Sequence, residues 1–473
     1  MEQGPTQRVE LPAELVGAIG PYLARQRWYA GKGPPVTMRL VEASLLVELS
    51  DDRGRLLWAV VEAEGADYQL VMAERPVVGE HLRGHDEAFI ASLGDRVYYD
   101  ATVDSEMALA LLVAASGGEE HAQRARPLGV EQSNTSLVYD DRLILKLFRR
   151  LSVGPNPDAD VTAALAATGF SHVAQPVVRW QRDGRDLAFG QQYLAGGTDG
   201  WALALTSLRD YYGSASSEAP VHPALSGGDF AAEISRLGQM TGEMHLAMAK
   251  AFGVSAQGLD DQWRALVGSI EARTRHLVPE LAVAAGPLLD RLSSVRDLGP
   301  AVRAHGDFHL GQVMRTDLGW YVLDFEGEPS RSLEERQRHT SVLKDVAGML
   351  RSLHYASQFA LGERTDNDLE LLQTCAQAWE DRNRSAFVRG YKQCKGTEGL
   401  LPLAPDDRGA VRVAFEVDKA LYELAYEQAF RPDWARIPRA ALQRLLSAPL
   451  TELVAGPVEP PEPSQAGDED REV

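Results

Sequence analysis

The sequence predicts an α+β protein in which a strand-rich N-terminal part precedes a mainly helical C-terminal part. Three observations predict this order. Alternating apolar segments recur before residue 93, a lysine stands inside the strand-like segment LILKLF, and long amphipathic helical segments dominate after residue 196. At 473 residues the chain is too long for a single compact core, so we expect several packed units.

Residues 1–92 are predicted to form a small α+β cap subdomain. Its opening segment, LPAELVGAIGPYLARQRW, has the apolar spacing of an amphipathic helix. The segments SLLVEL, LLWAVVEA and YQLVMAE then alternate as strands of an antiparallel sheet do. Nothing in this subdomain indicates catalysis.

Residues 93–195 are predicted to form a β-rich intermediate subdomain that completes the N-terminal lobe. SLVYD and RLILKLF are strand-like and separated by an acidic turn, which indicates a hairpin. ADVTAALAATG is helix-like, and LAFGQQYL is predicted to be an edge strand.

Residues 196–455 are predicted to be mainly helical, as in EISRLGQMTGEMHLAMAKAF and VRVAFEVDKALYELAYEQAF. Two strand-like pieces, RAHGDF and WYVLDFE, interrupt the helices. The tail, residues 456–473, is Pro-rich and acidic with few apolar residues, so we expect it to be disordered.

Composition excludes several classes of function. The net charge of -20 disfavours nucleic acid and anionic membrane surfaces as partners. No apolar run is long enough to span a bilayer, and the N-terminus lacks the features of a secretory signal. The two cysteines are too few for a zinc site or a disulfide framework. We therefore expect a cytoplasmic protein, and the sequence leaves its oligomeric state open.

The stretch HGDFHLGQ has two chemical interpretations. In the first, His305, Asp307 and His309 ligate a catalytic metal, because residues two apart in an extended segment share a face. In the second, Asp307 is a base that accepts a hydroxyl proton, while Gln312 and Asp324 hold magnesium.

Lys146, in LILKLF, favours the second interpretation. A lysine in an apolar strand either lies on the exposed face of that strand or needs anions nearby, which nucleotide phosphates would supply. Asp160, on the following predicted helix, is the acid expected to hold the lysine in place. The turn before the strand offers small polar groups that can approach phosphate oxygens: Ser133, Asn134, Thr135 and Ser136. Polar turn, strand lysine, helix acid, HGD and DFE follow one another in the order found in protein-kinase-like folds.

The chain resembles a known family at several motifs. HGDFHLGQ resembles the catalytic loop of aminoglycoside phosphotransferases, and DFEGEP is similar to their magnesium-binding segment. The set QRWYAGKG, EQSNTSLVY, LILKLFRRL, GPNPD, HGDFHLGQV, DFEGEP and KDVAGMLRS resembles the actinobacterial maltokinase-like proteins, over residues 20–440. The resemblance implies a bilobal protein-kinase-like fold of the aminoglycoside phosphotransferase type, with an N-terminal cap subdomain and a mainly helical C-lobe.

The resemblance also implies ATP and Mg²⁺ as cosubstrates and a free sugar as the phosphoryl acceptor. Asp307 would be the catalytic base, and the implied magnesium ligands are Gln312, Asp324 and Glu326.

For the nucleotide, the resemblance implies that Lys146 contacts the phosphates and pairs with Asp160. The strand GQQYL would be the hinge, with backbone groups of Gln192 and Leu194 near the adenine.

Departures from the maltokinase pattern bear on the acceptor. AYEQAFRPDWARIP replaces a segment that usually contains Asn-Arg-Pro, near helices that line the sugar pocket in this family. A related branch phosphorylates glucosamine at its 6-hydroxyl, and a cationic amino sugar favours carboxylates and aromatic rings. The C-terminal candidates, together with His309, are Glu416, Glu423, Glu427, Tyr426 and Trp434.

We therefore expect an ATP-dependent kinase that makes glucosamine 6-phosphate. The alternatives are a maltokinase making maltose 1-phosphate, an aminoglycoside phosphotransferase, a metal-dependent hydrolase built on HGDFH, and a non-catalytic nucleotide-binding relative.

Overall fold

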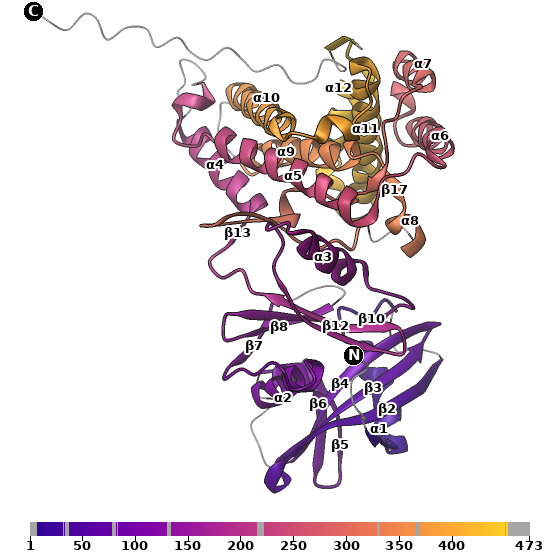
Figure 1. The fold of residues 1–473 in the computed structure, drawn as a ribbon, viewed down its shortest axis with the longest axis vertical. Helices are drawn as coiled ribbons and strands as arrows, with labels where there is room; N and C mark the ends of the chain where they lie inside the picture. The colour runs from indigo at the N-terminus through magenta and orange to yellow at the C-terminus, as the bar shows by residue number, and fades with distance from the viewer. Residues whose placement is uncertain are drawn as a thin grey trace, which may run out of the picture. The chain divides into compact units, whose positions relative to one another are not determined.

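A computed structural model describes residues 7–31, 33, 37–77, 82, 84–129, 134–214, 222–328, 332–364, 369–449 and 451–452 (Figure 1). The chain forms two compact units. Unit 1 comprises residues 1–166 and 174–196, and unit 2 comprises residues 167–173 and 197–473. The tail predicted to be disordered lies outside the described residues.

Unit 1 begins with an antiparallel sheet in the order β1-β2-β3-β4-β6-β5, and β10 pairs with β4. Its strands are β1 (Gln7–Arg8), β2 (Met38–Leu49), β3 (Gly54–Ala63), β4 (Ala66–Pro76), β5 (Phe89–Leu93), β6 (Arg96–Asp100) and β10 (Arg150–Leu151). The three strands predicted from alternating apolar residues lie within β2, β3 and β4. The predicted subdomain boundary after residue 92 falls inside β5, because β5 and β6 form a hairpin that turns at Gly94.

The first sheet is buried on both faces. Helix α1 (Ala13–Leu23) packs against one face, where its Leu15 and Ile19 belong to the same core as Leu57 and Ala59 of β3. Because side chains alternate along a strand, the residues between them face the opposite way, into a second core.

The second sheet of unit 1 has the order β11-β12-β9-β8-β7. Its strands are β7 (Ala125–Leu128), β8 (Asn134–Tyr139), β9 (Leu143–Phe148), β11 (Pro176–Arg182) and β12 (Arg185–Gln192). Strand β12, predicted to be an edge strand, is interior because it pairs with both β9 and β11. That prediction was wrong because pairing partners distant in sequence decide which strand is the edge.

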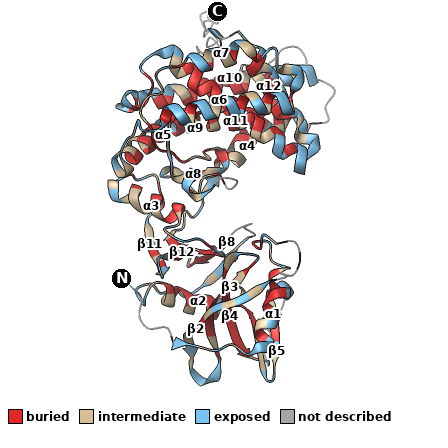
Figure 2. Ribbon diagram, turned by 90° about the vertical axis from the view of Figure 1, so that its right-hand side faces the viewer, coloured by how far each residue is buried: buried red, intermediate tan, exposed pale blue. Residues whose placement is uncertain are grey.

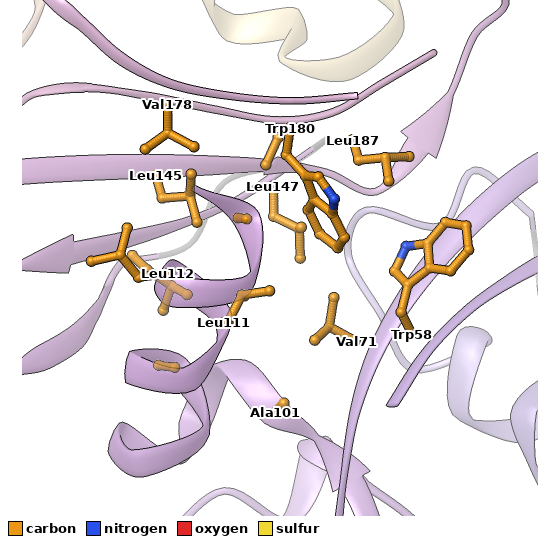
Figure 3. Close-up of a cluster of buried hydrophobic side chains, with 14 of the residues drawn as sticks. Trp58, Val71, Ala101, Leu111, Leu112, Leu145, Leu147, Val178, Trp180 and Leu187 are labelled. Atoms are coloured by element: carbon orange, nitrogen blue, oxygen red, sulfur yellow. The ribbon is translucent and has the colours of Figure 1, made fainter. Parts of the chain in front are cut away.

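Helix α2 (Ser105–Ala115) contributes to the core that the two sheets share (Figure 3). Leu111 and Leu112 of α2 lie near Leu145 and Leu147 of β9, while Trp58 extends from the first sheet. Unit 1 also contains most of α3 (Pro157–Thr168).

One buried polar side chain ties the two sheets together. Gln69 of β4 accepts a hydrogen bond from Trp58 Nε1 at 2.9 Å and donates to the carbonyls of Phe148 and Leu187. All three hydrogen bonds join buried groups, so the amide carries no desolvation penalty and fixes the sheets in register.

Unit 2 is mainly helical, as predicted. Its helices are α4 (Gly200–Ser214), α5 (Ala231–Phe252), α6 (Leu259–Leu277), α7 (Gly286–Ser294), α8 (Leu333–Gln337), α9 (Leu343–Gly362), α10 (Leu369–Gln393), α11 (Pro405–Phe430) and α12 (Arg436–Ser447). Helix α9 packs against α4, α10, α11 and α12, and most of its residues are buried (Figure 2).

Two small antiparallel sheets interrupt these helices. The first contains β13 (Thr198–Asp199), β15 (Val313–Thr316) and β16 (Gly319–Val322), and the second contains β14 (Val302–Arg303) and β17 (His339–Thr340). The HGD segment follows β14 and the DFE segment follows β16, so both are loops that leave short strands. Within the described residues, no helix has the length and apolar character needed to cross a membrane.

Candidate active site

Lys146 projects from the face of the second sheet that is turned away from the core. Its neighbours on β9, Leu145 and Leu147, are completely buried in the core, so strand alternation directs Lys146 to the other side. Its Nζ donates a hydrogen bond to Asp158 Oδ2 at 3.2 Å. The strand lysine thus has an acidic partner on α3.

That partner corrects the prediction of Asp160. Helix α3 starts at Pro157, and the Asn156 side chain accepts hydrogen bonds from its first turn, so Asp158 and Asp160 both lie in that turn. Residues two apart on a helix point about 200° away from each other, and it is Asp158 whose carboxylate meets Lys146. Asp158 is buried against the strand and Asp160 is half-buried.

Part of the predicted polar turn shares the face of Lys146. Ser136 of β8 is directly opposite Lys146, and opposed residues in an antiparallel pair point to the same side. Asn134, two residues earlier, points the same way, and both side chains are buried. Ser133 lies outside the described residues.

Other predicted nucleotide contacts are used within unit 1. The Thr135 hydroxyl accepts a hydrogen bond from Arg149 Nε at 2.8 Å, on the opposite face of β8 from Lys146. The backbone N–H of Gln192 donates to the carbonyl of Gln175 at 2.9 Å. Leu194 follows β12, and among the described residues its backbone makes no hydrogen bond to another backbone group.

In unit 2, Asp345 of α9 holds the loop that carries HGD (the HGD loop, residues 304–312). Its Oδ2 accepts a hydrogen bond from the backbone N–H of His305 at 2.8 Å, and its Oδ1 accepts one from Gly306 at 2.9 Å. The ring Nε2 of buried His245 lies 3.2 Å from Oδ2. Burial alone would raise the pKa of Asp345, but these partners hold it below its ordinary value.

His305 braces the same loop rather than facing a ligand. Its Nε2 lies 3.0 Å from the carbonyl oxygen of Leu323, and its ring packs against Phe308 and Phe325. Gly306 has φ +87°, a conformation that side chains rarely adopt, so the glycine is needed for the turn that follows.

Asp307 accepts a hydrogen bond from Lys419 of α11, whose Nζ lies 2.8 Å from Oδ1. Burial alone would raise the pKa of Asp307, but Lys419 foremost, with His309 and His305, lowers it to about 2. Asp307 is therefore ionised at neutral pH. Sequence analysis missed Lys419, which is 112 residues from Asp307 and has no motif to mark it.

His309 lies beside the same carboxylate. Its Nδ1 accepts a hydrogen bond from the backbone N–H of Gly311 at 3.1 Å, so the neutral ring carries its proton on Nε2. Nε2 lies 3.9 Å from Asp307 Oδ2. Burial lowers the pKa of His309 and outweighs the opposing effect of Asp307, so a neutral N–H donor is available next to the base.

The predicted magnesium ligands lie on two neighbouring segments, and two of them place carboxylates close together. The backbone carbonyl of Gln312 accepts a hydrogen bond from Leu323 N–H at 2.9 Å, which brings the DFE segment beside the HGD loop. Carboxylate oxygens of Asp324 and Glu326 lie within 4.8 Å of one another. Carboxylate and amide oxygens are hard donors, so this set fits Mg²⁺.

The alternative metal site at HGDFH does not form. Among the described residues, His305, Asp307 and His309 do not bring three donor atoms close enough together to share an ion. A ring nitrogen of each histidine, His305 Nε2 and His309 Nδ1, instead contacts a backbone group. The structure therefore gives no support to a hydrolase metal centre.

A cleft in unit 2 leads to Asp307. Asp307 lines a small pocket together with Glu328, Phe415, Asp418 and Lys419. Three of those residues, Glu328, Phe415 and Asp418, also line an adjoining cleft of about 460 Å³. Cavities of this size are typical of small-molecule sites.

Helix α6 forms another wall of this cleft with Gln262, Trp263 and Ser269. The Trp263 indole is held by a hydrogen bond from Nε1 to the carbonyl of Leu292 at 3.0 Å. Sequence analysis did not identify α6 as part of the site, because its residues carry no motif and its position depends on packing.

Comparison with protein families agrees with this arrangement. Residues 22–104 match the maltokinase N-terminal cap domain, and residues 124–327 match the phosphotransferase enzyme family. The chain thus resembles a maltokinase-type cap followed by a phosphotransferase. The resemblance and the fold predicted from the sequence are confirmed.

Relatives of this chain include two proteins named glucosamine kinase. It is 28% identical over 344 residues to that of Mycolicibacterium smegmatis, covering 70% of this chain and 82% of the relative. It is 27% identical over 471 residues to that of Streptacidiphilus jiangxiensis, covering 92% and 98%. A solved glucosamine kinase in complex with glucosamine, ADP and inorganic phosphate has the same fold, with a TM-score of 0.62, 21% identity, and coverage of 92% and 99%.

The residues predicted to contact the sugar near the C-terminus fall into two groups, buried acids and residues nearer the surface. Glu416 is completely buried and pairs with Arg384 at 2.7 Å and with Arg412, so it joins α10 to α11 and cannot face a sugar. Glu427 is buried as well, and accepts a hydrogen bond from Tyr355 Oη at 2.7 Å. Helix periodicity predicts that these acids share one face of α11. It does not tell whether that face meets solvent, a cleft or another helix.

The other three candidates remain nearer the surface. Glu423 pairs with Arg351 and lies close enough to Lys419 to contribute to its raised pKa, after the larger effect of Asp307. Tyr426 is exposed and packs against Phe430. Trp434 stacks on Phe359, with ring centroids 4.5 Å apart.

Proposed function

We propose that this phosphotransferase is an ATP-dependent sugar kinase that converts D-glucosamine to glucosamine 6-phosphate. The observation that carries the chemistry is an ionised aspartate, Asp307, held on the HGD loop at the end of a sugar-sized cleft. The relatives named glucosamine kinase, which match up to 92% of the chain, support the choice of sugar. A cytoplasmic location, where ATP is available, is part of the proposal.

In unit 1, the groups proposed to bind the nucleotide phosphates lie on one face of β8 and β9. Lys146 supplies a positive charge, and Asp158 keeps its ammonium from turning away. The amide of Asn134 and the hydroxyl of Ser136 offer further donors on the same face.

In unit 2, Asp324, Glu326 and Gln312 would hold Mg²⁺. When bound, the ion neutralises charge on the phosphates of ATP. The neighbouring HGD loop is kept in place by Asp345, so the metal ligands and the base belong to one braced structure.

Asp307 orients the acceptor. Its Oδ1 is occupied by Lys419, and among the described residues no hydrogen bond reaches Oδ2. Oδ2 accepts the acceptor hydroxyl hydrogen, and the His309 Nε2–H is close enough to donate to a sugar oxygen. A carboxylate with a low pKa suits this role, because the loose transition state needs alignment more than early proton removal.

In the proposed phosphoryl transfer, each bond formed or broken and the proton are accounted for. The acceptor oxygen forms a bond to the γ-phosphorus while the bond from that phosphorus to the β,γ-bridging oxygen breaks. ADP leaves with the electron pair of the broken bond, and the hydroxyl proton passes to Asp307.

The charge beside the base bears on which hydroxyl of glucosamine is the acceptor. Two like charges 4 Å apart repel by about 4 kcal/mol at an effective dielectric constant of 20. Lys419 beside Asp307 therefore disfavours a sugar whose ammonium group adjoins the reacting hydroxyl. The 6-hydroxyl is far from the amine at carbon 2, and the cleft offers Glu328 and Asp418 as candidate carboxylates for that amine, although Arg273 and Lys344 also line it.

The experiment is an ADP-release assay with ATP and Mg²⁺ against glucosamine, N-acetylglucosamine, glucose, maltose and an aminoglycoside. We expect turnover with glucosamine and little with its acetylated form, because acetylation removes the positive charge. Maltose is the alternative acceptor, because the cap matches the maltokinase cap domain. Preference for maltose or the aminoglycoside would refute the proposed sugar while retaining the kinase.

A matched set of variants tests which carboxylate of the cleft binds the ammonium group of glucosamine. Glu328→Gln and Asp418→Asn remove a carboxylate from the cleft, and the variant that raises KM for glucosamine identifies the amine partner. Glu62→Gln, in a surface ion pair with Arg39 of unit 1, makes the same change in charge at a residue that does not line the cleft and should leave KM unchanged. Unchanged KM in all three variants would contradict the placement of the amine.

A further inference from the structure

The ion pair between Asp307 and Lys419 joins two independently supported elements. Asp345 fixes the HGD loop by accepting hydrogen bonds from His305 N–H and Gly306 N–H. Helix α11 is tied to α6 on the other side, where Arg273 pairs with Asp418, the residue next to Lys419. Because neither support depends on the other, the distance between the ammonium and the carboxylate is set before any ligand binds.

The contact selects one oxygen of the base. Lys419 Nζ donates to Oδ1 at 2.8 Å, while the neutral His309 ring places its Nε2 3.9 Å from Oδ2. A carboxylate held at one oxygen by a directed hydrogen bond loses its freedom to rotate. The Lys419 ammonium also lies 5.1 Å from the centre of the Tyr422 ring, which limits the positions it can adopt.

Charged groups from each neighbouring element surround the pair. The HGD loop contributes His305 and His309, the segment after DFE contributes Glu328, and α9 contributes Lys344. Helix α11 contributes Asp418, Tyr422 and Glu423. Of these, Glu423 and Glu328 act on Lys419 with the same sign as Asp307 and keep its ammonium charged.

We propose that Lys419 is the positioning residue of the catalytic base, whose hydrogen bond to Oδ1 aims Oδ2 of Asp307 at the acceptor hydroxyl. This inference rests on the proposed kinase function but not on which sugar is the acceptor. Lys419 acts through Asp307 and is not itself required to touch the acceptor.

A purely structural role makes different predictions. Both side chains are largely withdrawn from solvent, with 25% of Lys419 and 19% of Asp307 exposed, so loss of the lysine can change stability as well as the base. A structural lysine would change unfolding without changing the acid dependence of the reaction. A positioning lysine changes that dependence, because without its charge the burial of Asp307 raises the pKa of the base.

The test compares Lys419→Met and Lys419→Arg with the wild type in kcat/KM over acidic to neutral pH. We expect Lys419→Met to lower kcat by roughly 10–100-fold and to move the acid limb of the profile upward by about 1–3 pH units. Lys419→Arg keeps the charge and should restore the wild-type acid limb. Lys392→Met, at an exposed position on α10, is the control for the loss of one positive charge.

Two additions keep the test decisive. If no sugar in the panel is phosphorylated, the same profiles are measured on slow ATP hydrolysis, in which water replaces the acceptor hydroxyl. The Asp307→Asn variant is then combined with Lys419→Met, and the double variant should be no slower than Asp307→Asn alone.

The outcomes separate the two proposals. An unmoved acid limb in a folded Lys419→Met protein, or an additive loss in the double variant, would overturn the positioning role. If no sugar is phosphorylated but Lys419→Met shifts the acid limb of ATP hydrolysis as expected, the sugar kinase is overturned and the positioning role remains supported. If Lys419→Met does not fold, the acid limb of Lys419→Arg decides, since a shifted limb there would also refute the inference.

Discussion

Replacing Asp345 by Asn tests how much the HGD loop depends on α9. The carboxylate accepts hydrogen bonds from His305 N–H and Gly306 N–H and lies beside His245; His305 and His245 are buried, and Gly306 is half-buried. Asn keeps one acceptor and turns an NH₂ group toward the other donor, leaving a buried N–H without an acceptor. Such a group costs about 1–3 kcal/mol, and the lost charge-assisted contact with His245 adds about 1.5–3 kcal/mol.

We therefore expect Asp345→Asn to lower the free energy of unfolding by about 3–5 kcal/mol, as broken buried pairs do. In a unit of this size, this corresponds to a fall in Tm of roughly 10 °C. Urea unfolding and calorimetry measure both quantities. The control is Asp210→Asn on the exposed surface of α4, which should change stability by less than about 0.5 kcal/mol.

The Asp345→Asn variant should also lose activity, and its free energy of unfolding should depend less on pH in the acidic range. A shift of the base by 1 Å reduces turnover by roughly 100-fold. Because the folded-state pKa of Asp345 is lowered, its stabilisation is present above the unfolded-state pKa of about 3.9 and is lost as pH falls through the folded-state pKa. The stability difference between wild type and variant should therefore shrink in that acidic window.

Two results would refute this reasoning. One is an Asp345→Asn protein with wild-type unfolding and kcat at neutral pH, which would mean that the loop is held by other contacts. The other is a stability difference that stays constant through the acidic window, which would mean that the carboxylate has no lowered pKa.

The remaining predictions concern the base, the strand lysine and the C-terminal acids. Asp307→Asn should reduce kcat by roughly 10²–10⁴-fold while ADP binding, measured by calorimetry, is unchanged. Lys146→Met should raise KM for ATP, and Asp158→Asn should do so more than Asp160→Asn; equal effects of the two acid variants would contradict the pairing with Asp158. Glu416→Gln should destabilise the protein by about 3–5 kcal/mol in urea unfolding without changing KM for the sugar, and a raised KM in a stable variant would return Glu416 to the acceptor site.

The elements with a clear periodicity were predictable. Alternating apolar residues identified β2, β3 and β4, and helical spacing identified α5 and α11, because burial of one face imposes these patterns on neighbouring residues. The interior position of β12 was not predictable in this way. Its partners, β9 and β11, are chosen by packing of the whole unit.

The site residues also differ in whether local sequence or tertiary packing decides their contacts. Sequence by itself proposed Asp307, Lys146 and the DFE acids as site residues, because their proposed roles depend on neighbours within a few positions. Only the tertiary structure decided that Asp158 pairs with Lys146, since a helix start one or two residues away changes which acid faces the strand. It likewise assigned Glu416 to a buried ion pair.

The sequence alone determined the kind of protein, a phosphotransferase whose HGD and DFE segments lie close along the chain, and it determined the repeating faces of the helices and strands. The tertiary structure decided what each face meets. It brought Lys419 to Asp307 across 112 residues and placed α6 along the cleft. Contacts over such separations leave no local pattern, because they arise from the packing of helices whose own sequences are consistent with many arrangements.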